Sequence, residues 1–141
     1  MKKTPVLVIL LLSLSPYCLR ADMVKGLNLS VPLMVSGSLG IPLGGGDPAQ
    51  QTIPMIEIEA GVGGGRLLLG LDGTRKGVGF GVKAALMRTW FEPIDIDEDQ
   101  LYLGAEFQAS VQRLVGSVGT YYNIDGNDDD FIVTLGLGIR L

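Results

Sequence analysis

Apolar and polar residues alternate along most of this chain with a period of two. In the last eleven residues, every second position from Phe131 to Leu141 is apolar, and small or polar residues lie between, with Ile132 as the exception. A strand places successive side chains on opposite faces, whereas a helix needs a period of 3.6. No segment combines the helical period with capping residues, so the pattern predicts an all-β protein.

The alternation predicts six extended stretches joined by short polar connections. Two of them are long for single strands, and splitting these at 36–38 and 63–65 gives eight. We therefore predict an antiparallel up-and-down barrel of about eight strands, with six long strands as the alternative. The six stretches are 27–43, 55–71, 78–87, 101–112, 114–123 and 131–141.

Two architectures share this alternation. A soluble sandwich or lipocalin-like barrel turns its apolar face inward, and a membrane barrel turns it outward. On the polar face of the four clearest strands, 7 of 20 residues are glycine and only 5 are charged. Water-exposed strand faces carry more charge, because glycine weakens strands. We therefore predict a narrow interior with paired charges, which are Glu57, Glu59, Lys83, Glu106 and Arg140.

Six aromatic residues flank the two acidic connections at 92–100 and 124–130. Such rings prefer the headgroup level of a membrane, so they are interpreted as an interfacial girdle of a transmembrane barrel. The alternative is a small core that caps one end of a soluble barrel. The six residues are Trp90, Phe91, Tyr102, Tyr121, Tyr122 and Phe131.

The closing stretch "FIVTLGLGIRL" resembles the C-terminal signal of bacterial outer-membrane barrels. In size the chain is similar to the smallest of them, OmpX and the membrane domain of OmpA, and it also resembles uncharacterised small Gram-negative barrels. The resemblance implies recognition of the last strand by the barrel-assembly machinery, contact with outer-membrane lipid and lipopolysaccharide, and acidic loops that face outward. One departure is Leu141, where the family usually has Phe or Trp.

The first 21 residues are predicted to be a cleaved signal peptide, which leaves 22–141 as the barrel. A basic start precedes the apolar run 6–14, which is too short for a membrane helix, and Ala21 fits the position before the cut. An uncleaved anchor is the alternative. Lipid attachment at Cys18 is disfavoured by the bulky Tyr17 before it. Export of a Gly-rich chain of this kind indicates the outer membrane of a Gram-negative bacterium.

Charge and composition exclude several functions for residues 22–141. Removing Lys2, Lys3 and Arg20 leaves 8 basic residues against 15 acidic ones, a net charge of −7, which argues against nucleic-acid binding. This part of the chain contains neither cysteine nor histidine. Barrel enzymes of the protease, deacylase and palmitoyl-transferase types resemble one another in using histidine. We therefore predict neither catalysis nor a cofactor.

Three motifs invite chemical interpretations that are weak. "GVGGGR" at 61–66 lacks the Lys-Ser/Thr of a phosphate loop, and a strand break explains it better. Asp125, Asn127 and Asp129 alternate as calcium ligands do, but the loop lacks the required Gly and bidentate Glu. Weak divalent-ion binding there, or at 95–99, is set against a solvated loop. An acid/base role for interior carboxylates is set against simple charge pairing.

Three functions are left by the sequence. The first is a small outer-membrane barrel with a structural or surface-interaction role and no catalysis. The second is a narrow pore or conduit for small molecules. The third is a soluble periplasmic lipocalin-like barrel that binds a lipophilic ligand.

Overall fold

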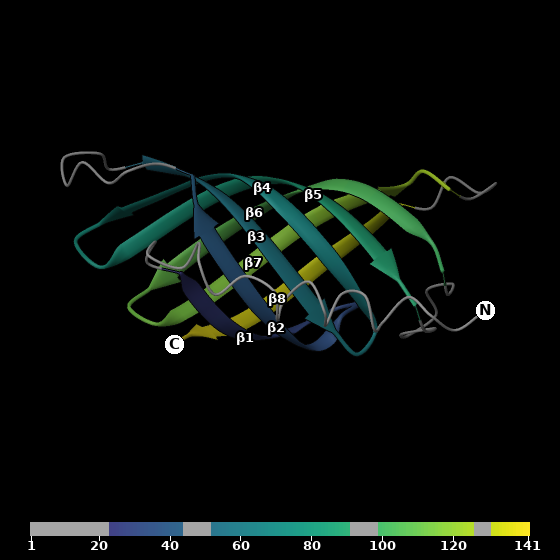
Figure 1. Ribbon diagram of the computed structural model, residues 1–141, viewed down its shortest axis with the longest axis horizontal. Helices are drawn as coiled ribbons and strands as arrows, with labels where there is room; N and C mark the ends of the chain where they lie inside the picture. Colours follow the sequence, from purple (N-terminus) through teal and green to yellow (C-terminus); the bar gives the residue numbers. More distant parts are fainter. Residues whose placement is uncertain (1–22, 44–51, 91–98, 126–130) are drawn as a thin grey trace, which may run out of the picture.

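The computed structural model describes residues 23–43, 52–90, 99–125 and 131–141, which form a closed barrel of antiparallel strands (Figure 1). Each strand pairs with the next along the chain, and the first pairs with the last. The predicted eight-stranded barrel is confirmed, and the six-strand alternative is wrong. The strands are β1 (Val24–Ser30), β2 (Met34–Pro42), β3 (Thr52–Gly61), β4 (Gly64–Arg75), β5 (Val78–Thr89), β6 (Leu101–Val111), β7 (Leu114–Asn123) and β8 (Phe131–Arg140).

Because strand direction alternates, the connections collect at two rims. We call the first the C-terminal rim, and it contains the turns at 76–77 and 112–113 together with Leu141. We call the other the loop rim, and it contains the turns at 31–33 and 62–63 and the strand ends at Trp90 and Asp125. The C-terminal rim lies at the left of Figure 1.

The tight turn at the end of β4 has the geometry expected of a two-residue hairpin. Lys76 and Gly77 have φ values of 51° and 81°, and Arg75 pairs with Val78 on either side of them. Positive φ at both central residues is the signature of a type I′ turn, whose twist matches that of the flanking strands. The predicted polar turn at 72–77 is therefore shorter than expected, and β4 continues to Arg75.

One predicted strand break was misplaced. The sequence suggested a break at 36–38, but Ser36 to Ser38 pair with β1 on one side and with β3 on the other. The chain turns instead at 31–33, where Pro32 has no N–H with which to continue the ladder. The second break was close to its prediction, because the chain turns at 62–63 and Gly64 already begins β4.

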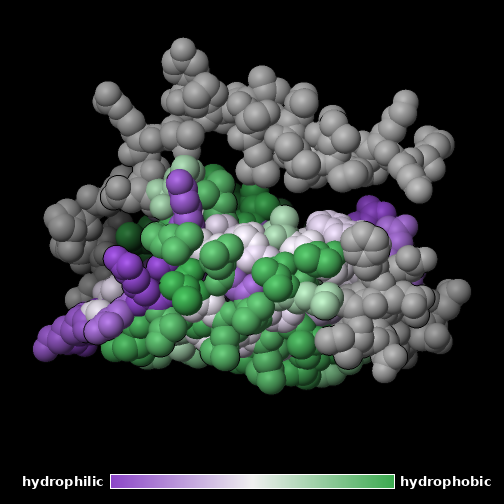
Figure 2. All heavy atoms as spheres, turned by 90° about the horizontal axis from the view of Figure 1, so that it is seen from below, coloured by the Kyte–Doolittle hydropathy of each residue, from purple (hydrophilic) through white to green (hydrophobic). Residues whose placement is uncertain are grey.

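Apolar side chains cover the outside of the barrel, and the charged side chains of the predicted inner face lie inside it. Leu135 and Leu137 are 65% and 73% exposed, whereas Glu106 and Gln108 are 1% and 5% exposed. Figure 2 shows the hydrophobic spheres along the flank of the molecule. We call this surface the apolar belt. Its members occur on every strand and include Leu29, Val35, Ile58, Leu69, Val82, Phe107, Val118 and Leu135.

The shortest strand pairing in the barrel is the one between β1 and β8. β1 pairs with β8 only from Gly26–Arg140 to Ser30–Gly136, and the N–H of Val31 then donates to the carbonyl oxygen of Leu135 over 3.1 Å. Within the described residues, the first four residues of β8 therefore have a strand neighbour only on the β7 side.

An apolar cluster closes the interior near the loop rim. The turn at 31–33 places the side chain of Leu33 inside the barrel with no exposed surface. Ile132, the exception in the alternation of the last strand, packs against this cluster. The fully buried members are Leu33, Leu68, Ala85, Met87, Tyr102 and Tyr121.

Candidate functional site

Two carboxylates and a guanidinium meet in the middle of the barrel. Arg66 Nη2 lies 2.6 Å from Glu59 Oε2, and its Nε donates to the same oxygen over 2.7 Å. Arg66 Nη1 pairs with Glu106, and the hydroxyl of Tyr121 donates to Glu106 Oε2 over 3.0 Å. Ser36 donates to the other oxygen of Glu59. The ion pairs have no more than 2% of their side-chain surface exposed, so they lie out of water.

A second group of charges lies nearer the C-terminal rim. Lys83 Nζ lies 2.5 Å from Glu57 Oε2 and 3.4 Å from Asp72 Oδ2, and that same Asp72 oxygen lies 3.5 Å from Arg140 Nη2. Gln108 joins the two groups, because it donates to Glu106 over 2.9 Å and accepts from Lys83 over 2.9 Å. We call the whole set the interior network.

The interior network connects the entire wall of the barrel. Its side chains come from β2 to β8, and Ser36 Oγ also lies 3.4 Å from the backbone carbonyl oxygen of Asn28 in β1. A buried charge is tolerated only when it is paired and hydrogen-bonded. Four carboxylates face three cations, and each carboxylate lies within ion-pair distance of at least one of these cations. The members are Ser36, Glu57, Glu59, Arg66, Asp72, Lys83, Glu106, Gln108, Tyr121 and Arg140.

The five charged residues singled out in the sequence all belong to this network. Glu59, Lys83 and Glu106 are 1% exposed, and Glu57 is 9% exposed. Arg140 lies at the edge, with 26% of its side chain exposed.

Two members were missed in the sequence. Arg66 follows the triple glycine, where the alternation changes phase, and the restart at Leu67 and Leu69 was the available signal that Arg66 lies on the opposite, inner face. Asp72 was assigned to a turn, but it lies within β4.

The aromatic girdle was wrong for two of its six members. Tyr102 and Tyr121 are 2% and 0% exposed and point into the barrel. For Tyr121 the physical reason is space. A Cβ on Gly104 or Gly119 would come within 2.7 Å of its ring, so these two glycines make room for the ring inside the barrel. Its hydroxyl then reaches the interior network.

The other aromatic residues behave differently. Trp90, Tyr122 and Phe131 are exposed at the loop rim, and Phe91 lies outside the described residues. Trp90 packs over Gly65, where a Cβ would come within 2.7 Å of its ring, and its indole N–H donates to the carbonyl oxygen of Val62 over 3.0 Å. An exposed ring with a satisfied polar atom is suited to a boundary between apolar and polar surroundings.

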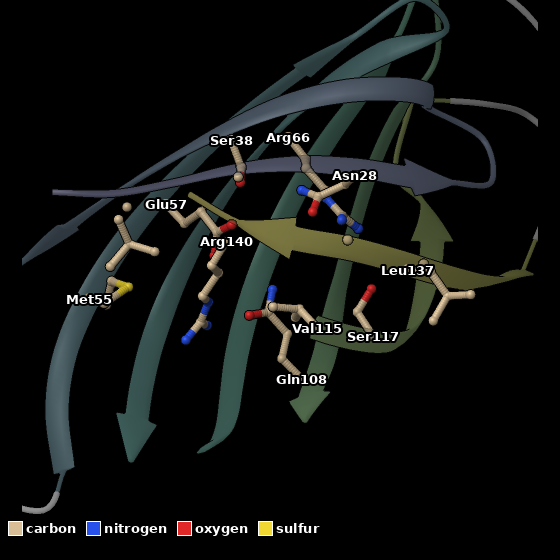
Figure 3. A pocket seen from close by; sticks show the side chains of 15 residues that line it. Asn28, Ser38, Met55, Glu57, Arg66, Gln108, Val115, Ser117, Leu137 and Arg140 are labelled. Atoms are coloured by element: carbon tan, nitrogen blue, oxygen red, sulfur yellow. The ribbon is translucent and has the colours of Figure 1, made fainter. Parts of the chain in front are cut away.

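A small cavity lies between the interior network and the C-terminal rim (Figure 3). In Figure 3 the side chains of Glu57, Gln108 and Arg140 point into it, while Leu137 points away. Its volume is about 20 Å³, and a neighbouring cavity beside Asp72 measures about 10 Å³. One water needs about 10–15 Å³, so these cavities have room for isolated waters and for no larger solute.

The carboxylates of the network are engaged in pairing. Glu59 and Glu106 each bind Arg66, and Glu57 binds Lys83, so each of the three acid/base candidates faces a buried cation. Oδ1 of Asp72 has no hydrogen-bond partner among the described residues, and it lies beside Gly81. This arrangement supplies structural charge compensation, because the two carboxylates that accept hydrogen bonds from Ser36 and Tyr121 are each already bound by Arg66.

The metal-site hypothesis concerns the acidic connections. Asp125 is described, and its N–H donates to Asn123 Oδ1 over 2.9 Å, but Asn127, Asp129 and the segment 91–98 lie outside the described residues. Within the described ranges, no group of three or more His, Cys, Asp or Glu side chains is placed to hold a metal ion. No helix in the same ranges has the length and apolar character needed to cross a membrane.

Comparison of the chain with protein-family models, with curated proteins and with solved structures finds no match.

Proposed function

We propose that this chain is a small outer-membrane β-barrel protein of a Gram-negative bacterium, with a structural or surface-interaction role and no catalytic activity. The observation that carries the proposal is the sidedness of the barrel. The apolar belt surrounds it, while the charged side chains of five strands meet inside it. A soluble barrel of this size would bury the opposite face.

The energetics of the two faces support a lipid environment. Exposed apolar surface costs about 25 cal/mol per Å² in water, and the belt repeats such surface around the whole barrel. In hydrocarbon that cost disappears, provided that every backbone N–H and C=O is paired within the protein. A sheet closed between β1 and β8 meets this condition along most of its length.

The interior weighs against the two alternatives. A conduit needs a continuous lumen, but the interior network and the apolar cluster fill the barrel together and meet at Tyr121. A lipocalin-like carrier needs a ligand cavity of about 300–1,000 Å³, which is far larger than the 20 Å³ found here.

We also propose three partners for the protein. The belt would contact outer-membrane lipid, and the loop rim would contact lipopolysaccharide. The assembly machinery would bind β8, whose outward residues run from Phe131 to Ile139. The proposed leader at 1–21 lies outside the described residues.

Membrane fractionation combined with gel mobility tests the proposal. The protein expressed from its full sequence should be recovered with outer membranes, and its folded form should migrate differently from the boiled form on a gel. Recovery in the periplasmic fraction without detergent, with one gel mobility before and after boiling, would refute it. A variant with Leu135→Lys and Leu137→Lys is the matched control, because charge on the lipid face should abolish insertion.

A further inference from the structure

The exposed basic side chains are concentrated at one rim of the barrel. Lys25, Arg75, Lys76 and Arg113 are all exposed at the C-terminal rim. We call these four residues the cationic arc. In Figure 2 hydrophilic spheres lie at both ends of the barrel, and those at the left-hand end are where the C-terminus lies in Figure 1.

Backbone contacts hold the cationic arc together. The N–H of Gln112 donates to the carbonyl oxygen of Gly77 over 2.9 Å, which joins the turn bearing Lys76 to the turn bearing Arg113. The N–H of Arg140 donates to the carbonyl oxygen of Arg113 over 2.7 Å, and that of Leu141 donates to Lys25 over 2.8 Å. The arc therefore follows the rim from β4 through β8 to β1.

The charges of the arc are not neutralised by the part of the protein that is described. None of its four members forms an ion pair with a described residue. Asp72, which lies near this rim, is turned inward and bound by Lys83 and Arg140. The loop rim is different, because its exposed Arg88 binds Asp99 over 2.6 Å.

The arc adjoins the apolar belt directly. Arg113 precedes Leu114, which is 66% exposed, and Lys25 contacts Leu141, which is 74% exposed. If the belt lies in the hydrocarbon of a bilayer, the arc lies at the depth of the lipid phosphate groups, in the leaflet that surrounds the C-terminal rim. Long basic side chains at this depth extend their charge toward the headgroups while their stems stay on apolar surface.

We propose that the cationic arc binds the phosphate groups of anionic phospholipids in the leaflet at the C-terminal rim and so sets the depth and tilt of the barrel. This inference rests on the proposed membrane location and adds a lipid class to it. A phosphate diester matches the arc in charge, and the fluid leaflet supplies several such groups around one rim. Each Lys or Arg near an anionic surface contributes roughly fivefold to binding.

The test compares unfolding by urea in two kinds of vesicle, phosphatidylcholine alone and phosphatidylcholine mixed with phosphatidylglycerol. The protein is compared with a variant carrying Lys25→Gln, Arg75→Gln, Lys76→Gln and Arg113→Gln. Adding phosphatidylglycerol should increase the folded-to-unfolded ratio of both proteins by different factors. The factor for the original protein should be at least about ten times the factor for the variant. High salt should remove this difference, because it screens exposed charges.

Two controls keep the outcomes separate. Arg88→Gln should respond to lipid as the original protein does, since Asp99 already neutralises Arg88. If the fourfold variant does not fold, Arg113→Gln is measured alone, with an expected effect of about fivefold. Equal responses of variant and original protein to phosphatidylglycerol would overturn the inference while leaving insertion intact. Absence of a heat-modifiable band in both kinds of vesicle would overturn the membrane proposal and the inference together.

Discussion

At the scale of single residues, several interior positions require glycine, because backbone atoms of the neighbouring strand lie where a Cβ would be. A Cβ on Gly70 would lie 2.1 Å from the carbonyl oxygen of Val82 and 2.6 Å from the Cα of Lys83. Backbone atoms of a paired strand cannot move aside without breaking the ladder. A Cβ on Gly37 would meet nothing within 4 Å.

This contrast predicts opposite outcomes for two identical substitutions. Gly70→Ala should lower the free energy of unfolding by about 3 kcal/mol, at the upper end of ordinary overpacking. Gly37→Ala should be neutral or slightly stabilising, because alanine restricts the unfolded chain more than glycine does. Urea unfolding followed through the single tryptophan, Trp90, measures both. Equal effects of the two variants would contradict the close packing at Gly70.

Arg66 is the most heavily used side chain of the interior network. Arg66→Leu would leave Glu59 and Glu106 buried without their shared cation, and removing one partner of a buried pair costs about 3–5 kcal/mol. The free energy of unfolding in urea should fall by that amount. Arg88→Gln, which removes an exposed partner of Asp99, should change it little. An unchanged stability of Arg66→Leu would show that the network is not rigidly paired.

The residue scale also shows what sequence reasoning can find and what it cannot. Glu106 and Lys83 were located because they lie in long, regular alternations, where the face of a residue follows from its number. Arg66 was missed because a glycine run shifted the phase before it. Tyr121 was misplaced because one of the two glycines that make room for its ring, Gly104, lies on the neighbouring strand and not beside it along the chain.

At the scale of the strands, the existence of the elements was predictable and the position of one turn was not. The alternation through 27–43 continues across Pro32 without a visible break, so nothing local distinguished a turn at 31–33 from one at 36–38. The pairing partners decide the matter, because Ser36 needs both Asn28 and Gly61 beside it. Register is a property of neighbouring strands and is fixed by the fold as a whole.

The short β1 strand has a dynamic consequence. In the described structure Val133 lies nearer the loop rim than the last β1–β8 pair, Ser30–Gly136, and has no partner in β1. Leu137, on the same face of β8, pairs with Leu29. The amide of Val133 should therefore exchange with solvent deuterium faster than that of Leu137, since unpaired backbone opens at little cost. Residue-resolved hydrogen exchange measures the two rates. Equal protection would mean that another segment pairs with the upper half of β8.

At the scale of the whole molecule, one inference from composition decided the sidedness. Alternation alone suits a barrel with either face inward, and the abundance of glycine on the polar face was the evidence that this face lies inside. The structure agrees, with Gly70 and Gly104 packed against backbone of the neighbouring strand. A narrow barrel has little internal volume, so its strands must trade side chains for glycine wherever two backbones or one large ring need the space.

The filled interior makes a prediction about transport. The apolar cluster around Leu33 and Tyr121 blocks the loop rim, and the pairs of Arg66 and Lys83 block the middle. The two barriers touch at Tyr121, whose ring belongs to the cluster and whose hydroxyl donates to Glu106, but a gap beside Leu33 still leaves the ion pairs of Arg66 and Lys83 in place. The purified protein should therefore show no channel events in a planar bilayer in which a porin, added as a positive control, conducts.

Leu33→Ala sharpens this experiment. The substitution removes part of the apolar barrier, yet the charged layer below it stays intact, so the variant should also be silent. Its cost should appear in stability instead, as a loss of about 2–5 kcal/mol for a fully buried leucine. Reproducible conductance steps from the original protein would mean that the interior network opens in the membrane, and the pore would then replace the structural role. Steps from Leu33→Ala alone would mean that the apolar cluster is the only effective barrier and that the charged layer admits ions.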